Sequence, residues 1–362
     1  KCSITADPTD ARYVFAVWDR LVAASNAGPS YGARSTNGGQ SWEPARSIYD
    51  AGPLGQTINN QVVVLPNGTL IDFFTQIDVG INQPLSSTIN IVRSTDKGAT
   101  WSPPIRISDV LSVGTVDPET RLGVRDASGF GSIAVSPQGT LNVVWQDARS
   151  TGGVRDVIVL SRSTDAGATW STPLRINADP SVQAFTPAIA VRADGMLGVT
   201  YYDLRSNTVD PATLLTDYWM IRSSDGINWR ESRVAGPFDL SIAPNANGLF
   251  LGDYQALATI GNVFVPFFAQ TNTAEMNNRT DIFAVVARNA SAAAADGGLK
   301  QRASPTPAKA VAEYKAELVP ASAVKAETRR AASDGIARAM ERRIPGWGAR
   351  SATRPPPELP AP

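Results

Sequence analysis

The chain has 362 residues, and its 33 lysines and arginines are balanced by 33 aspartates and glutamates. This balance excludes the strong net charge with which proteins bind nucleic acid or acidic membranes. The absence of histidine excludes a Ser-His-Asp or Cys-His catalytic site, a histidine general base and a histidine-bound zinc ion. No apolar run has the length of a transmembrane helix, and the single Cys2 has no partner for an internal disulfide bond.

The chain opens with "KCSITADPTD", which reads like the middle of a chain, so we expect a leader or a longer segment to precede it. Farther on, one pattern recurs four times, as "RSTNGGQSW" from Arg34, "RSTDKGATW" from Arg93, "RSTDAGATW" from Arg162 and a shorter "RSSDGINW" from Arg222. The copies start about 60 residues apart, which suits a repeated four-stranded sheet bounded by turns.

Every repeat unit has the same predicted order of elements. An apolar strand A such as "NQVVVLP" or "GSIAVSP" is followed by a Gly-containing turn such as "PNGT" or "PQGT" and by an apolar strand B such as "LNVVWQD". A variable loop, a strand C such as "DVIVLSRS", the repeated pattern and a short strand D such as "PLRIN" complete the unit. The β-branched and aromatic residues lie in the strands, and Gly, Asp, Asn and Pro lie in the connections.

Radially repeated four-stranded sheets form a β-propeller. We therefore predict an all-β fold with a propeller over residues 1–288 and five recognisable blades, the fifth without the pattern and without a clear fourth strand. A missing N-terminal segment could supply the closing strand or a sixth blade. Residues 289–362 form an Ala/Pro-rich linker and tail, which we expect to be partly helical and mostly disordered or loosely docked.

The repeated pattern has the form S-x-D-x-G-x-T-W, and residues 94–101 and 163–170 match it fully. Residues 35–42 match it with Asn37 in place of Asp and Ser41 in place of Thr, and residues 223–229 match it in shortened form. It resembles the Asp-box of the sialidase-like, or BNR-repeat, superfamily. The resemblance covers roughly Ser3 to Arg288 and implies boxes that are structural and lie away from the substrate. From the residues alone we expect the same: Ser and Asp bind the turn backbone, Gly takes a positive φ, and Trp packs between strands.

Propeller geometry places the box turns at one face and the B–C loops and D–A connections at the other, which we call the mouth face and expect to hold the binding cleft. Several arginines on this face suit a carboxylate ligand, because a guanidinium pairs with a carboxylate through two hydrogen bonds. The candidate binding residues are Arg20, Arg125, Arg149, Arg205, Arg279, Asp147, Asp203 and Gln255.

The resemblance implies an arginine cluster on the substrate carboxylate, an Asp acid/base, and a Tyr nucleophile activated by a Glu; sialidases are exceptions to the two-carboxylate plan of glycosidases. On this basis we assign Asp126 as acid/base, Tyr254 as nucleophile, and Asp253 or Glu275 as its acidic partner. The arginine triad would be Arg20, Arg149 and Arg205.

Two features depart from the family pattern. The Arg-Ile-Pro segment expected before the first box is absent, and "RIP" at Arg343–Pro345 lies in the tail. No Glu is placed clearly as the partner of a Tyr. An alternative also stands for two candidate pairs, because "QDAR" and "YDLR" are parallel segments in which Asp147 with Arg149, and Asp203 with Arg205, would be repeated ion pairs that fix strand ends.

The expected function is that of a secreted or cell-surface glycoside hydrolase of the exo-sialidase type, a monomer that acts on a terminal acidic sugar of a glycan. The alternatives are a non-catalytic glycan- or protein-binding propeller and a polysaccharide lyase that acts on a uronic acid. We expect no cofactor and no metal ion, since the clustered aspartates lack EF-hand-like spacing, and no nucleic-acid partner.

Overall fold

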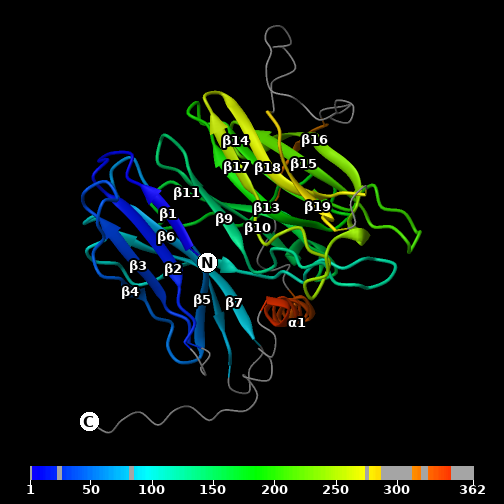
Figure 1. The fold of residues 1–362 in the computed structure, drawn as a ribbon, viewed down its shortest axis with the longest axis horizontal. Helices are drawn as coiled ribbons and strands as arrows, with labels where there is room; N and C mark the ends of the chain where they lie inside the picture. The colour runs from blue at the N-terminus through cyan, green and yellow to red at the C-terminus, as the bar shows by residue number, and fades with distance from the viewer. Residues whose placement is uncertain are drawn as a thin grey trace.

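The structure, a computed structural model, describes residues 2–22, 27–80, 85–273, 277–286, 312–318 and 325–343. Within these residues the chain forms five antiparallel sheets that follow one another in sequence and are arranged radially (Figure 1). This arrangement confirms the predicted β-propeller with five blades.

Four of the blades contain at least four strands. Blade 1 comprises β1 (Cys2–Ala6), β2 (Val14–Asp19), β3 (Ser30–Ser35) and β4 (Arg46–Tyr49). Blade 2 comprises β5 (Gly55–Val64), β6 (Leu70–Asp78), β7 (Ser86–Ser94) and β8 (Ile105–Asp109). Blade 3 comprises β9 (Gly131–Val135), β10 (Leu141–Asp147), β11 (Val157–Ser163) and β12 (Leu174–Arg175), with the 3₁₀ turn η1 (Arg149–Thr151) after β10. Blade 4 comprises β13 (Ala184–Val191), β14 (Leu197–Asp203), β15 (Leu215–Ser223) and β16 (Asn228–Asp239), followed by η2 (Leu240–Ile242).

Blade 5 has three strands, β17 (Ala256–Ile260), β18 (Val263–Thr271) and β19 (Thr280–Ala284). In the part of the chain that the structure describes, its extensive contacts with another blade are with blade 4. Apolar side chains are exposed on blade 5 and on blade 1, with Ile282 exposed by 76% and Ile4 by 66%.

The hydrophobic core lies between the faces of successive blades. Because side chains alternate along a strand, Leu70 of β6 faces blade 1, where it packs with Phe15, whereas Phe73 faces blade 3, where it packs with Trp145. Corresponding clusters join blade 3 to blade 4 and blade 4 to blade 5. The two-sided burial explains why strands A and B read as nearly continuous apolar runs.

The repeated boxes form the turns expected from their residues. In residues 94–101, Ser94 Oγ donates to Asp96 and accepts from the backbone N–H of Gly98, while Asp96 accepts from both the N–H and the hydroxyl of Thr100. Gly98 has a φ of +76°. The side-chain hydrogen bond from Thr100 and its backbone hydrogen bond lower the pKa of Asp96 to about 2.

The boxes also contact the preceding blade. Arg34 of blade 1 donates to the carbonyl of Lys97 in the blade 2 box at 3.0 Å, and Arg162 of blade 3 donates to the carbonyl of Asp225 in the blade 4 box at 2.6 Å. The boxes therefore link neighbouring blades at the face opposite the mouth.

The C-terminal segment is docked more closely than the sequence suggests. Strand β20 (Ala312–Lys315) pairs with β16, and β21 (Glu317–Leu318) pairs with β12, so this segment extends the outer edges of blades 4 and 3 in turn. Helix α1 (Ala326–Arg343), drawn in red below the centre of Figure 1, lies near β7. Among the described residues, no helix has both the length and the apolar character needed to cross a membrane.

Candidate functional site

A cavity of about 420 Å³ lies where the inner strands of the five blades converge. All five blades contribute to its wall: Cys2 and Ser3 from β1; Asn59, Asn60 and Gln61 from β5; Ala127, Phe130, Gly131 and Ser132 from β9 and the segment before it; Thr186 and Pro187 from β13; and Asp253, Tyr254 and Gln255 from the segment before β17. Most of these positions belong to D–A connections or to the starts of A strands, so the cavity lies toward the mouth face.

Two β-bulges shape the wall of the cavity. The register of β5 shifts between Ile58 and Gln61, and that of β13 shifts between Phe185 and Ala188. Inside the bulges, Asn59 has a φ of +65° and Thr186 a φ of +52°. A left-handed backbone is costly for a β-branched residue such as threonine, and such strain is common at functional sites.

Hydrogen bonds between blades hold these bulges in place. The side-chain amides of Asn59 and Gln61 both donate to the carbonyl of Gly131, at 2.7 and 2.8 Å, and Gln255 Nε2 donates to the carbonyl of Thr186 at 2.8 Å. Two buried amide atoms of the wall, Asn60 Nδ2 and Gln255 Oε1, have no hydrogen-bond partner among the described residues. Both residues belong to the cavity wall, but these two atoms themselves are buried behind its surface.

An aromatic surface lies on one side of the cavity. The ring of Tyr254 stacks on that of Phe130, with centroids 6.0 Å apart and planes 13° apart, and Tyr254 is 50% exposed. Its neighbour Asp253 forms an ion pair with Arg125 through two hydrogen bonds, of 3.1 Å from Nε and 3.0 Å from Nη2. Asp253, Tyr254 and Gln255 are the predicted site residues that the structure brings together in the cavity, with Arg125 bound to one of them.

Asp126, the expected acid/base, does not line the cavity. It is 1% exposed and accepts hydrogen bonds from the N–H groups of Thr115 and Ser128 and from Gln146 Nε2. The same Gln146 nitrogen donates to the buried Asp156, while Gln146 Oε1 accepts from the N–H of Thr186 in the cavity wall. Asp126 therefore belongs to a buried network that supports the bulge at Thr186.

Burial, together with the negative charge of Asp126, raises the pKa of Asp156 to about 7. The side chain is fully buried and accepts from Ser112 Oγ and from the N–H groups of Val113 and Gly114. These hydrogen bonds lower the pKa, but they do not cancel the effect of burial and of the nearby Asp126.

Arg149 and Arg205 are each paired within their own blade. Arg149 binds Asp147, whose Oδ2 also accepts from Trp145 Nε1 at 2.9 Å. In blade 4, Arg205 binds both Asp203 and Glu231. The structure thus has the repeated ion pairs that the parallel segments "QDAR" and "YDLR" suggested.

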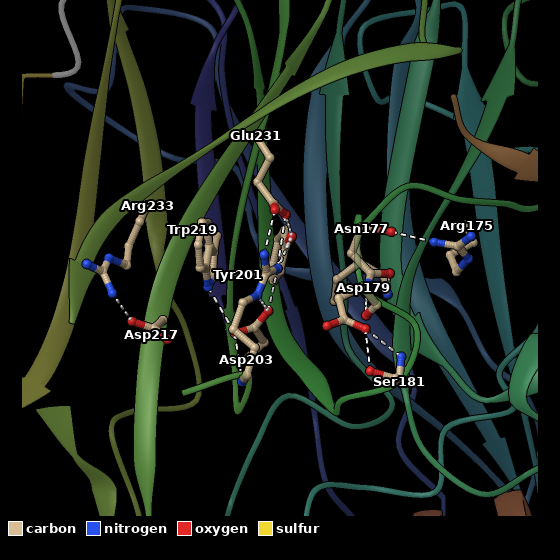
Figure 2. Close-up of polar contacts among 12 residues, drawn as sticks. Arg175, Asn177, Asp179, Ser181, Tyr201, Asp203, Asp217, Trp219, Glu231 and Arg233 are labelled. Atoms are coloured by element: carbon tan, nitrogen blue, oxygen red, sulfur yellow. Dashed lines mark hydrogen bonds and ion pairs between the residues drawn. The ribbon is translucent and has the colours of Figure 1, made fainter. Parts of the chain in front are cut away.

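Figure 2 shows Asp203 among its neighbours in blade 4. Asp203 accepts from Trp219 Nε1 at 2.9 Å, and the Tyr201 hydroxyl donates to Glu231. The guanidinium of Arg205 lies 3.7 Å from the centroid of the Trp219 ring. Tyr201, Asp203 and Glu231 are all at most 2% exposed, so this Tyr–Glu pair is part of the blade core and does not line the cavity.

The remaining candidates lie elsewhere. Arg20 stacks on Tyr31 of its own blade, 5.1 Å from the ring centroid, and bonds its hydroxyl. Arg279 is exposed at the end of blade 5, and Glu275 lies outside the described residues. Arg20, Arg149 and Arg205 do not converge on one point of the cavity, because each is held by a partner on its own blade. Among the described residues, no three Cys, Asp or Glu side chains are grouped so as to hold a metal ion.

The predicted site residues did not include Asn59, Asn60, Gln61, Ser132 or Thr186, although the D–A connections "GQTINNQ" and "VQAFTP" were expected on the mouth face. A signal for these residues exists in the repeats. When the first strands are aligned on "VVVLP", "IAVSP" and "IAVRA", the residues just before these runs are "NNQ", "FGS" and "TPA", which have no residue in common. In a propeller these corresponding positions face one axis, so their side chains meet in one cavity.

No protein-family model matches the sequence, and no curated protein matches it. Similar solved structures include a protein of unknown function from Dyadobacter fermentans, with 15% identity over 79% of this chain and 77% of that chain and a TM-score of 0.46. A mutant of the α-L-arabinofuranosidase arb93a from Fusarium graminearum has 14% identity over 79% and 92% of the two chains and a TM-score of 0.46. The Hadza microbial sialidase Hz136 has 18% identity over 79% and 65%, with a TM-score of 0.39. These likenesses assign neither a family nor an activity.

Proposed function

We propose that the protein binds a carbohydrate in the cavity, with a sugar ring lying on the exposed face of Tyr254. One observation carries the proposal: the half-exposed ring of Tyr254 lines a cavity whose wall is otherwise formed mainly by amide, hydroxyl and small apolar side chains from all five blades. Sugar hydroxyls both donate and accept hydrogen bonds, and the C–H face of a sugar ring packs on an aromatic ring, so a sugar fits a wall of this composition.

The dimensions of the cavity agree with this ligand class. Its volume of about 420 Å³ lies in the usual range for small-molecule sites and suits a mono- or disaccharide. The bulges at Asn59 and Thr186 are held by inter-blade hydrogen bonds, so the wall is preorganised and little ordering is needed on binding.

The charge of the wall favours a neutral sugar over an acidic one. Asp253 is the one acidic residue that lines the cavity within the described part of the chain, and it is bound by Arg125. The rest of the wall consists of amide, hydroxyl, thiol, aromatic and small apolar side chains. An acidic sugar needs a cationic partner of its own, whereas Arg149 and Arg205 already hold buried carboxylates.

Binding without hydrolysis is favoured for a related reason. The usual glycosidase plan places two carboxyl groups on either side of the scissile bond, and the described wall of the cavity contains one, which is held in an ion pair. The secreted or cell-surface location and the monomeric state expected from the sequence remain part of this proposal.

The binding test uses the full chain and a fixed set of neutral sugars, namely lactose, maltose, cellobiose and their monosaccharides, measured by titration calorimetry. Tyr254→Ala should remove binding of any sugar that the wild type binds, and Asn60→Leu should weaken it. Trp42→Ala is the matched control, because Trp42 is an exposed aromatic residue, 40% accessible, in the first box. Equal affinity of the Tyr254 and Trp42 variants would contradict the proposed site.

A second candidate function is an exo-glycosidase with Tyr254 as the nucleophile. The observation in its favour is that Tyr254 is exposed and that Asp253, its neighbour in the chain, lines the same cavity. Its test is the hydrolysis of an activated sialoside and an activated neutral glycoside by the wild type and by Tyr254→Phe. Turnover that is lost in the Phe variant supports it, and turnover that is unchanged excludes Tyr254 as the nucleophile.

A further inference from the structure

Helix α1 is seated on the mouth face of the propeller, behind the wall of the cavity. Its buried Ile336 and Met340 pack in one cluster with Ile58, Ala127 and Phe130. Ala127 and Phe130 line the cavity from the other side. The helix therefore contacts residues that shape the cavity, while no residue of the helix lines it.

The helix approaches the main chain of the propeller very closely. A Cβ atom placed on Gly335 would lie 2.5 Å from the Cα of Val113, and one placed on Gly153 would lie 3.0 Å from the Cα of Thr328. Arg338 Nη2 donates to the carbonyl of Val113 at 3.1 Å. Glycine in the middle of a helix is unfavourable, and its presence at 335 is explained by this close approach.

The last turn of α1 is bonded to the rim of the cavity. Arg342 Nη1 donates to the carbonyl of Val124 at 2.6 Å, and the Arg342 carbonyl accepts from Asn247 Nδ2 at 3.1 Å and from Arg125 Nη1 at 3.5 Å. Arg125 is the residue that binds Asp253. A continuous set of contacts thus joins α1, through Arg342 and Arg125, to the carboxylate beside Tyr254.

One β-bridge and its hydrogen bonds make this connection stiff. Val124 forms a parallel bridge with Leu249, and the N–H of Arg125 donates to the Leu249 carbonyl at 2.8 Å. The segment before blade 3 and the segment before blade 5 are therefore held together just where Arg342 binds. Movement of the end of α1 has to move both segments, or break these bonds.

We propose that α1 is an intramolecular latch that holds the cavity in its ligand-accepting shape, with Arg342 as a positioning residue, so that docking of α1 and carbohydrate binding favour each other. The mutual effect of docking and carbohydrate binding rests on the proposed function, whereas the role of α1 in holding the shape of the cavity does not. Because the coupling is thermodynamic, a bound sugar has to shift the docking equilibrium of α1 by the same factor by which docking strengthens binding.

The first test is Gly335→Leu in the full chain, which places a side chain against the Val113 backbone while improving helix propensity. Arg330→Leu is the matched control, because Arg330 is exposed on the same helix. Hydrogen exchange is measured without sugar over residues 123–130 and 250–255. We expect it to be at least about tenfold faster in the Gly335 variant, within the usual range of coupling, and unchanged in the control. Fast exchange of α1 with unchanged exchange in those two segments would overturn the latch.

The second test locks the helix. The Cβ position of Gly153 lies 3.6 Å from the Cβ of Thr328, within the range for a disulfide bond. Gly153→Cys with Thr328→Cys, in a Cys2→Ser background, is compared in its oxidised and reduced forms, so that backbone strain at residue 153 is common to both. Binding of lactose, maltose and cellobiose should be at least as tight in the oxidised form as in the reduced form. In Gly335→Leu it should be about tenfold weaker than in the wild type. Tighter binding by Gly335→Leu than by the wild type would overturn the latch. If the wild type binds none of these sugars, the proposed function is contradicted, and the exchange experiment still decides whether α1 is a latch.

Discussion

The guanidinium of Arg125 and the carboxylate of Asp253 form a two-bonded ion pair that joins the segment before blade 3 to the segment before blade 5. The side chains are 18% exposed each, and the guanidinium also lies 4.5 Å from the centroid of the Phe250 ring. Fork-like pairs of this kind fix geometry as well as contributing energy. This pair therefore sets the position of Asp253 beside Tyr254.

Arg125→Met should lower the free energy of unfolding by about 1.5–3 kcal/mol, the usual range for hydrogen bonds to charged groups, and should weaken carbohydrate binding. Arg12→Met is the matched control, because Arg12 forms a similar pair with Asp10 but is 73% exposed, and it should leave stability nearly unchanged. Urea unfolding of the two variants checks the difference. Equal loss in both would show that the Arg125 pair has no special structural role.

At position 186, glycine should be tolerated better than alanine. The φ of +52° at this position is strained for a β-branched residue and relaxed for glycine, so Thr186→Gly should be more stable than Thr186→Ala by about 1 kcal/mol. Ala188→Gly, two residues farther along the same strand, should instead be destabilising. Thermal unfolding of the three variants gives the comparison, and a Gly variant less stable than the Ala variant would exclude strain at this position.

Asp156 should make stability fall as the pH rises. Its pKa of about 7 lies above the ordinary value of 3.8, so the folded state binds the proton more tightly than the unfolded state. This contribution is fully present below pH 4 and is lost as the pH rises through 7. Asp156→Asn should therefore be more stable relative to the wild type at pH 8 than at pH 5.

Asp96→Asn is the control for that experiment. Hydrogen bonds lower the pKa of Asp96 to about 2, so its contribution is present above pH 4 and is lost only as the pH falls toward 2. Between pH 5 and pH 8 the stability of this variant relative to the wild type should be constant. Urea midpoints at the two pH values suffice, and a flat difference for Asp156→Asn would contradict the shifted pKa.

Asp72 should be a destabilising residue. It is fully buried in β6, neither carboxylate oxygen has a hydrogen-bond partner among the described residues, and burial raises its pKa well above 3.8. Asp72→Leu should raise the free energy of unfolding by about 1–3 kcal/mol, the cost of an unsatisfied buried group. Asp147→Leu, at an equally buried carboxylate that binds Arg149, should lower it by about 3–5 kcal/mol. A loss in both variants would indicate that Asp72 has a partner.

The repeated boxes could be read from the sequence because their hydrogen bonds are local. Ser94, Asp96, Gly98 and Thr100 satisfy one another within seven residues, so their spacing alone predicts the turn. The segment "FLGDYQ" was also found, since it is not repeated in the other blades. By contrast, the sequence does not distinguish Asp126, Arg149 and Arg205 from active-site residues of the same types. Only their hydrogen-bond and ion-pair partners on other segments show that they have structural roles.

By itself, the sequence determined the blade order, the turns and which face each loop occupies, because strand periodicity and turn chemistry act over a few residues. Only the tertiary structure decided which polar side chains share the cavity. Asn60, Thr186 and Gln255 come from three blades, and their convergence depends on bulges and on packing between sheets. The seat of α1 was decided in the same way, since a helix finds its place by the fit of its buried face and of Gly335 against a surface assembled from distant segments.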